Sequence, residues 1–267
     1  MASKRVLLWT TPRCVSTAFE RSIMTLKSTK VLHEPFSASF YFGPERQSLR
    51  YAADPVQPNQ SYRSVSKTLQ KDFDGIDVLF SKDMAYAVQN HFNMFSEEGF
   101  KDFKHTFLIR EPAKAIISLY HASTNPKLTG WSYFDPEEAG FRQMLGLYHY
   151  ISQHIDDSPV VIDADDLLDF PNETMKSYCE AVGITYESNM TSWEPGPVAD
   201  WDTWAGWHEN ALKSSGFTRR SHRNTQKNSY DEEIEQLPAE VKMAIDEARA
   251  CFEYLAARKL DVRGTEV

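Results

Sequence analysis

Residues 5–24, RVLLWTTPRCVSTAFERSIM, join an apolar strand to a helix through a turn that contains Pro12 and Arg13. Ser16 and Thr17 stand where the helical pattern begins. A helix N-terminus presents N–H groups and the positive end of a dipole, and an arginine fork suits phosphate or sulfate oxygens. The segment therefore predicts a strand, loop and helix that open an α/β fold and bind an anion.

Two common phosphate loops do not match this segment. It has no glycine, and Arg13 stands three residues before Ser16, whereas a Walker A loop has lysine immediately before Ser or Thr. The phosphatase pattern C-x5-R also fails, because six residues separate Cys14 from Arg21.

Strand-like and helix-like segments alternate along the chain, which predicts a parallel sheet covered on both faces. The sequence predicts one domain over residues 1–267, since a single α/β domain can reach this size. Strands are expected at 5–10, 30–34, 77–81, 105–110 and 159–163. Helices are expected at 17–28, 84–96, 112–123, 136–156, 171–182 and 238–258. Irregular regions are expected at 43–60, a loop long enough for a lid, and at 193–230.

Composition narrows the classes of partner. The net charge of −9 and the pI near 5.4 argue against a nucleic-acid surface. No apolar stretch approaches the length of a membrane span. Three cysteines without a CxxC pair favour a reducing compartment. We therefore expect a cytoplasmic protein with neither a nucleic-acid nor a membrane partner.

Three windows carry a resemblance to PAPS-dependent sulfotransferases. Thr10–Thr17, TTPRCVST, resembles their 5′-phosphosulfate loop, usually Tyr-Pro-Lys-Ser-Gly-Thr-Thr, and is most similar to the divergent branch with Pro-Arg-Ser-x-Ser-Thr-Ala. Phe107–Pro112, FLIREP, is similar to the 3′-phosphate motif, in which Arg and a Ser eight residues later hold the 3′-phosphate of PAPS. Val31–Phe36, VLHEPF, resembles the strand whose end supplies the general base in many relatives. In order along the chain, the resemblance covers roughly residues 4–185.

The resemblance implies a three-layer α/β sandwich with a mainly parallel sheet, of the P-loop NTPase-like sulfotransferase type. It implies transfer of a sulfuryl group from PAPS to a hydroxyl, or less favourably an amine, of a small molecule, with PAP as product and no metal. The family's C-terminal basic element has no clean copy here, and the nearest basic loop contains Arg219 and Arg220. The residues expected to bind the cofactor are Arg13, Cys14, Val15, Ser16, Thr17, Ala18, Arg110, Ser118, Arg219 and Arg220. Arg13 would also act in catalysis, by charge and bidentate hydrogen bonds.

His33 and Glu34 are the two candidates for the base. Alternation along a strand sends neighbouring side chains to opposite faces, so both are not expected in one crevice unless the strand has ended. Pro35 is expected to hold Glu34 extended at the carboxyl edge of the sheet, where such folds bind ligands. We therefore expect Glu34 to be the base and keep His33 as the alternative.

Other polar and aromatic residues could have either a functional or a structural role. Lys82 and Asp83, at the end of a strand, could face the ligand crevice or form an ordinary ion pair at a helix start. The acidic run 163–166 could pass for Walker B or metal-ligating acids, but the sulfotransferase resemblance favours a structural role. Four tryptophans could wall an acceptor pocket, although core packing is expected for most of them: Trp193, Trp201, Trp204 and Trp207.

Two other functions stay open from the sequence. One is a P-loop phosphotransferase that uses ATP, which shares the loop–helix architecture but lacks the Walker A glycines and lysine. The other is a nucleotide-binding protein without catalysis.

Overall fold

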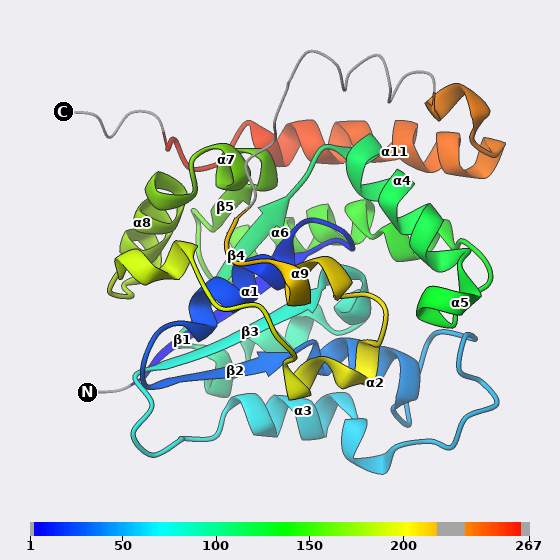
Figure 1. Cartoon of the computed structure of the whole chain (residues 1–267). Coiled ribbons are helices and arrows are strands. Elements are labelled where there is room, and N and C mark those ends of the chain that lie inside the picture. The colour runs from blue at the N-terminus through cyan, green and yellow to red at the C-terminus, as the bar shows by residue number, and fades with distance from the viewer. Residues whose placement is uncertain (1–2, 218–232, 263–267) are drawn as a thin grey trace.

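A computed structural model describes residues 3–217 and 233–262. Its centre is a five-stranded sheet in the order β2-β3-β1-β4-β5, and every neighbouring pair is parallel. Helices cover both faces of this sheet (Figure 1). The predicted strands are confirmed, with bounds β1 (Lys4–Thr10), β2 (Thr29–His33), β3 (Val78–Met84), β4 (Phe103–Ile109) and β5 (Val160–Asp163).

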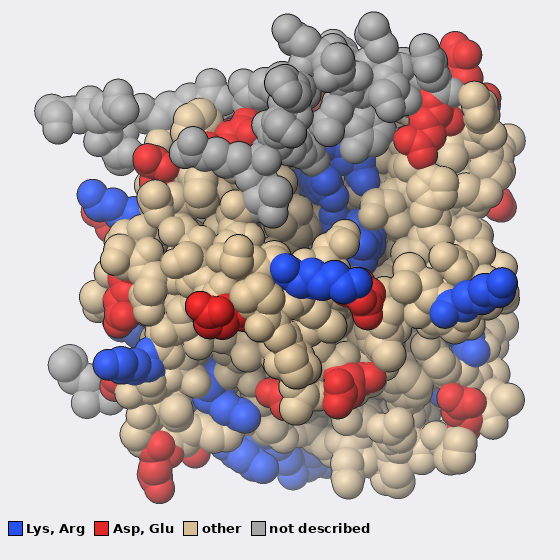
Figure 2. Space-filling view, in the orientation of Figure 1, with Lys and Arg blue, Asp and Glu red and all other residues tan. Residues whose placement is uncertain are grey.

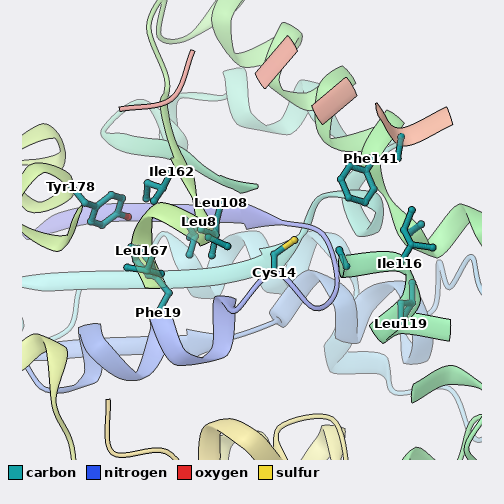
Figure 3. Packing of buried hydrophobic residues seen from close by; sticks show 14 of the residues in the cluster. Leu8, Cys14, Phe19, Leu108, Ile116, Leu119, Phe141, Ile162, Leu167 and Tyr178 are labelled. Carbon is teal, nitrogen blue, oxygen red and sulfur yellow. The ribbon is translucent and has the colours of Figure 1, made fainter. Parts of the chain in front are cut away.

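Side-chain alternation in β1 divides the core into two halves. Val6 and Leu8 belong to one cluster of buried apolar residues, whereas Leu7 and Trp9 belong to the other. A parallel strand buried on both faces needs apolar residues at every position, which explains the continuous apolar run. Figure 3 shows part of the first cluster, with Leu8 among side chains from several helices.

The helices divide between these two clusters. Those that contribute to the first are α1 (Ser16–Met24), α4 (Pro112–Ser123), α7 (Ala164–Asp169), α8 (Pro171–Val182) and α11 (Ala239–Ala256). Those that contribute to the second are α2 (Pro35–Phe42), α3 (Tyr62–Leu69) and α6 (Phe141–His154), together with the C-terminal end of α11; the first residue of α6, Phe141, belongs to the first cluster. Two short helices, α5 (Pro126–Thr129) and α9 (Glu209–Lys213), lie in the connecting segments. Within the described ranges, no helix is both long and apolar enough to cross a membrane.

Several helix predictions were wrong in detail. Residues 84–96 form the end of β3 and two 3-10 turns, η2 (Ala85–Val88) and η3 (Phe92–Ser96), instead of one helix. The helix expected at 136–156 is a 3-10 turn, η5 (Pro136–Ala139), followed by α6, because Gly140 between them has a φ of 75°. The helix expected at 17–28 ends at Met24.

Helices α2 and α3 were missed. All residues of α2 except Pro35 are buried, so its sequence PFSASFYF shows no polar face and no helical period. Residues 43–60 are irregular as expected, apart from the short 3-10 turn η1 (Pro58–Gln60). That the whole chain forms one domain stays a prediction.

Candidate active site

The loop between β1 and α1 has a glycine-like backbone without glycine. Arg13 has a φ of 66° and Val15 a φ of 67°, in the left-handed region that residues with a Cβ rarely adopt. Such strain persists where the surrounding structure holds it, and it gathers at ligand sites. Successive N–H groups around left-handed residues converge into a concavity that suits an anion.

Helix α1 begins directly after this loop with its N-terminus open. Its N-cap residue, Val15, makes no side-chain cap hydrogen bond. The first N–H groups of α1 therefore lack a capping side chain, and the helix dipole adds positive potential at the same place. Ser16 and Thr17 add two hydroxyls, so this end of α1 is suited to phosphate or sulfate.

Two arginines from neighbouring strands meet beside the loop. Arg110, which follows β4, donates from Nη1 to the carbonyl oxygen of Arg13 at 2.6 Å. Arg13 donates from Nε to Ser118 Oγ at 3.1 Å and from Nη1 to the carbonyl oxygen of Trp207 at 2.7 Å. Burial, and then the charge of Arg110, lower the pKa of Arg13. Two cations held this close repel each other, so an anion that contacts both relieves the repulsion.

A pocket of about 780 Å³ opens over the carboxyl ends of the strands, a size typical of small-molecule sites. Figure 2 shows Lys and Arg atoms inside a hollow on one face of the molecule. The cationic end of the pocket is lined by residues that include Arg13, Val15, Ser16, Thr17, Ala18, Arg110, Lys114, Ser118 and Phe217. The aromatic end is lined by Glu34, Tyr41, Met84, Tyr86, Trp131, Glu138, Trp204, Trp207 and His208.

A buried group of ionisable side chains lies against the pocket at Glu34. Lys82 is completely buried and forms an ion pair with Glu34 Oε1, and its Nζ lies 3.7 Å from Glu20 Oε2. Glu20 also accepts a hydrogen bond from Trp201 Nε1 at 2.8 Å. Burial alone would raise the pKa of Glu20, but the charges of His33 and Lys82 bring it below its ordinary value. Lys82 is therefore a structural cation that holds two carboxylates in place.

A chain of hydrogen bonds links Glu20 to the pocket through two histidines. His33 Nδ1 lies 2.8 Å from Glu20 Oε2, and His33 Nε2 lies 3.1 Å from His208 Nε2. His208 Nδ1 lies 3.2 Å from Thr17 Oγ1. Because an ionised carboxylate only accepts, His33 Nδ1 carries a proton. Burial first, then nearby positive charges led by Lys82, lower the pKa of His208, which keeps it neutral.

The hydrogen bonds that link His33, His208 and Thr17 can be donated from His33 toward Thr17 or from Thr17 toward His33. If His33 Nε2 donates to His208 Nε2, then the neutral His208 carries its proton on Nδ1 and donates it to Thr17 Oγ1. Thr17 then has its own O–H proton left for a group in the pocket. In this direction both ring nitrogens of His33 donate, Nδ1 to Glu20 and Nε2 to His208.

His33, Glu34 and His208 also have the residue types of a metal site, since one ligand atom from each lies within 4.8 Å of the others. The ammonium of Lys82 already contacts Glu34 Oε1. That contact makes divalent-cation binding unfavourable while Lys82 is charged.

The structure brings most of the predicted cofactor residues to the pocket. Cys14 is the exception, because its side chain is completely buried in the first core cluster beside Leu8 and Leu108 (Figure 3). Only its backbone can serve a ligand. Burial also raises the pKa of Cys14 above its ordinary value, which disfavours the nucleophilic thiolate. Arg219 and Arg220 lie outside the described residues.

The predicted extended backbone at Glu34 was wrong, whereas the expectation that His33 and Glu34 do not both face the pocket is confirmed. Strand β2 ends at His33, and Glu34 has φ 47° and ψ 47°, so Pro35 does not hold it extended. The two side chains therefore converge, with His33 Nε2 3.8 Å from Glu34 Oε1. Glu34 lines the pocket, whereas the side chain of His33 is only 2% exposed and is not among the lining residues.

Asp83 and the acidic run 163–166 have structural contacts. Asp83 accepts hydrogen bonds from the backbone N–H groups of Phe36 and Ser37 and so anchors the start of α2, a role that neither interpretation of Asp83 included. Asp163 caps α7 through Asp165 N at 2.8 Å. The ammonium of Lys259 lies 3.1 Å from Asp163 Oδ2. The structural interpretation of the run 163–166 agrees with these contacts.

Sequence reasoning missed His208, Trp131 and Glu138, and it offered a pocket wall as only one of two interpretations of the four tryptophans. His208 stands in the range 193–230, which the sequence predicts as irregular and whose described part contains the 3-10 turn η7 (Ala199–Trp204) and the helix α9. No periodicity in the sequence there shows which side chains face inward. Trp204 and Trp207 line the pocket, while Trp201 contacts the buried Glu20 and Trp193 is not among the lining residues. A polar or aromatic residue in an irregular segment carries no geometric signal until the segment is folded.

Comparisons with known proteins agree with this geometry. A family model described as "Sulfotransferase domain" matches residues 4–238. Two curated Arabidopsis thaliana proteins are similar, "Branched-chain-amino-acid aminotransferase-like protein 2" at 27% identity over 223 residues and "Branched-chain-amino-acid aminotransferase-like protein 1" at 26% over 220 residues. Each match covers 79% of this chain but only 35% and 36% of those proteins. The chain thus spans about a third of the length of the curated relatives it matches.

Two solved structures share the fold. A sulfotransferase from Alicyclobacillus acidocaldarius aligns with a TM-score of 0.56 and 12% identity over 97% of this chain and 98% of that one. The sulfotransferase domain of the Synechococcus PCC 7002 olefin synthase aligns with a TM-score of 0.56 and 14% identity, over 94% of each chain. These alignments confirm the predicted fold class.

Proposed function

Because the chain belongs to the sulfotransferase domain family, we propose that it transfers a sulfuryl group from PAPS to a hydroxyl, or less favourably an amine, of a small molecule. The observation that carries this proposal is the paired arginine site. Arg110 donates to the backbone carbonyl of Arg13, and Arg13 donates to Ser118, beside a left-handed loop and an uncapped helix N-terminus. Together they offer two adjacent anion positions, one for each phosphate-bearing end of PAPS.

The cofactor would lie along the cationic end of the pocket. The loop N–H groups, Thr17 and Arg13 would hold the 5′-phosphosulfate, and Arg110 with Ser118 would hold the 3′-phosphate. PAPS supplies the sulfuryl group, whose sulfur passes in line from a phosphate oxygen to the acceptor oxygen. Arg13 would neutralise the charge that develops on the bridging oxygen, acting by charge and hydrogen bonds and not as a general acid, because guanidinium does not give up its proton.

Glu34 is the proposed base. Lys82 holds its Oε1, and no hydrogen bond from another described residue to Oε2 is seen, so Oε2 can take the acceptor's proton. His33 would act as a positioning residue through His208, which keeps the Thr17 hydroxyl proton directed toward the transferring group. The account uses no metal.

The experiment that tests the function is a comparison of nucleotides. In buffer with EDTA, PAP should raise the melting temperature of the protein, because both anion positions are built from protein groups. In a separate buffer with Mg²⁺ and no EDTA, ATP should raise the melting temperature less. Labelled PAPS incubated with mixed alcohols and amines should then give a labelled organic sulfate. A larger shift with ATP–Mg²⁺ would favour the phosphotransferase alternative, and PAP binding without any transfer would favour a protein that only binds nucleotide.

A further inference from the structure

The aromatic end of the pocket has a continuous wall of large rings. The ring of Tyr41 lies 5.5 Å from that of Trp131 and 5.5 Å from that of Trp204. Trp131 lies 4.6 Å from Trp207, and the Tyr41 hydroxyl lies 3.0 Å from that of Tyr86. These five residues, the aromatic wall, all line the pocket. Such packed rings present electron-rich faces, to which an organic cation is attracted.

A carboxylate is set into the same wall. Glu138 is 2% exposed and lines the pocket, and it accepts a hydrogen bond from Tyr41 at 3.0 Å and from Arg50 Nε at 2.8 Å. Arg50 is not among the lining residues, and its guanidinium lies 3.7 Å from the ring centre of Trp131. A ligand in the pocket therefore contacts the carboxylate side of this ion pair. Burial raises the pKa of Glu138 even with Arg50 beside it, so a further cation nearby would stabilise the ionised form of Glu138.

Charge differs between the two ends of the pocket. Glu34 and Glu138 both belong to the aromatic end. None of the described lining residues contributed by α2, by η2 or by residues 131–138 is Lys or Arg. An anionic acceptor would meet two carboxylates there, Glu34 paired with Lys82 and Glu138 paired with Arg50, and no cationic side chain of these segments faces it.

We propose that the acceptor is a small organic cation that carries a hydroxyl, such as an ammonium alcohol, with its cationic group against the aromatic wall and Glu138. This inference rests on the proposed function. The cationic head would occupy the wall and the hydroxyl would reach toward Glu34. The hydroxyl oxygen then forms a bond to sulfur, the bond from sulfur to the phosphate oxygen of PAPS breaks, and the hydroxyl proton passes to Glu34. The products are a zwitterionic sulfate ester and PAP.

The test compares choline with its neutral carbon isostere, 3,3-dimethylbutan-1-ol, which has the same shape without the charge. Binding to the PAP-saturated protein and to the protein alone is followed by tryptophan fluorescence and calorimetry. We expect choline to bind at least about 10-fold more tightly than the isostere, since cation–π attraction is strong in desolvated sites. Equal binding, tighter binding of the isostere, or no binding of choline and of tetramethylammonium would overturn the proposal.

Variants locate the site. Glu138→Gln and Trp204→Leu should each reduce the preference for choline over the isostere several-fold, and Trp204→Leu keeps the test decisive should Glu138→Gln fail to fold because Arg50 loses its partner. Trp193→Leu is the matched control, because Trp193 lies in the same segment but does not line the pocket. An unchanged preference in a folded Trp204→Leu protein would contradict the assignment. Binding of PAP without binding of any organic cation would contradict this inference and leave the proposed function standing. Binding of choline without binding of PAP would contradict the proposed function.

Discussion

At the scale of single residues, the chemistry of the site depends on conformations that the sequence did not reveal. Glu34 was identified from its place at a strand end, but its left-handed backbone and its contact with Lys82 come from tertiary packing. Lys82 was known only as a polar residue after an apolar strand, and nothing in the local pattern showed that it is completely buried. Local patterns locate candidate residues, whereas side-chain partners distant in sequence decide their roles.

The division of roles between Glu34 and His33 gives a prediction at this scale. Glu34→Gln should lower kcat by about 10²–10⁴, the usual contribution of a general base, and leave PAP affinity nearly unchanged. His33→Gln should lower kcat less, because His33 acts only through His208 and Thr17. Calorimetry with PAP serves as the control for folding and cofactor binding. A His33→Gln enzyme that binds PAP normally and is the more impaired of the two would assign the base to His33.

At the scale of elements, the strands could be predicted and several helices could not. Strand β1, for example, carries an apolar run that parallel pairing buries on both faces, so its signal does not depend on where its partners lie in the sequence. Helix α2 is buried almost all round and therefore has no amphipathic period. The loop before α1 was identified from Arg13, Ser16 and Thr17, but its left-handed turns were not foreseen because no glycine marks them.

The left-handed backbone at Val15 predicts that glycine is more stable than alanine at this position, the reverse of their order inside a helix. Alanine has a Cβ and is strained at a left-handed φ, whereas glycine is not, so Val15→Gly should be more stable than Val15→Ala by about 1 kcal/mol. The matched control is Ala18, inside α1, where Ala18→Gly should cost about 1 kcal/mol by helix propensity. Urea unfolding of the three variants measures both differences. If Val15→Ala is the more stable of its pair, the loop does not have this conformation in solution.

At the scale of the whole molecule, the pocket joins segments that are far apart in the chain. Its cationic end comes from two strand-to-helix junctions whose short motifs could be found in the sequence. Its aromatic end includes residues of α2, of η2 and of the segments 131–138 and 204–208, which meet only in the folded chain. Arg21, in α1, holds the start of the segment that leads to Trp204, because it donates to the carbonyl oxygens of Glu194 and Gly196. The cationic end was therefore predictable from short motifs, and the aromatic end was not.

The most direct test of the central claim is the affinity of the protein for PAP and for AMP, which lacks the 3′-phosphate, measured by calorimetry without divalent metal. If Arg110 and Ser118 form a 3′-phosphate site, PAP should bind more tightly than AMP by about 2–4 kcal/mol, and Arg110→Ala should remove most of that difference. Ser118→Ala should remove about 1 kcal/mol, as expected of a neutral hydroxyl. Equal affinities for PAP and AMP in the unmutated protein would contradict the account.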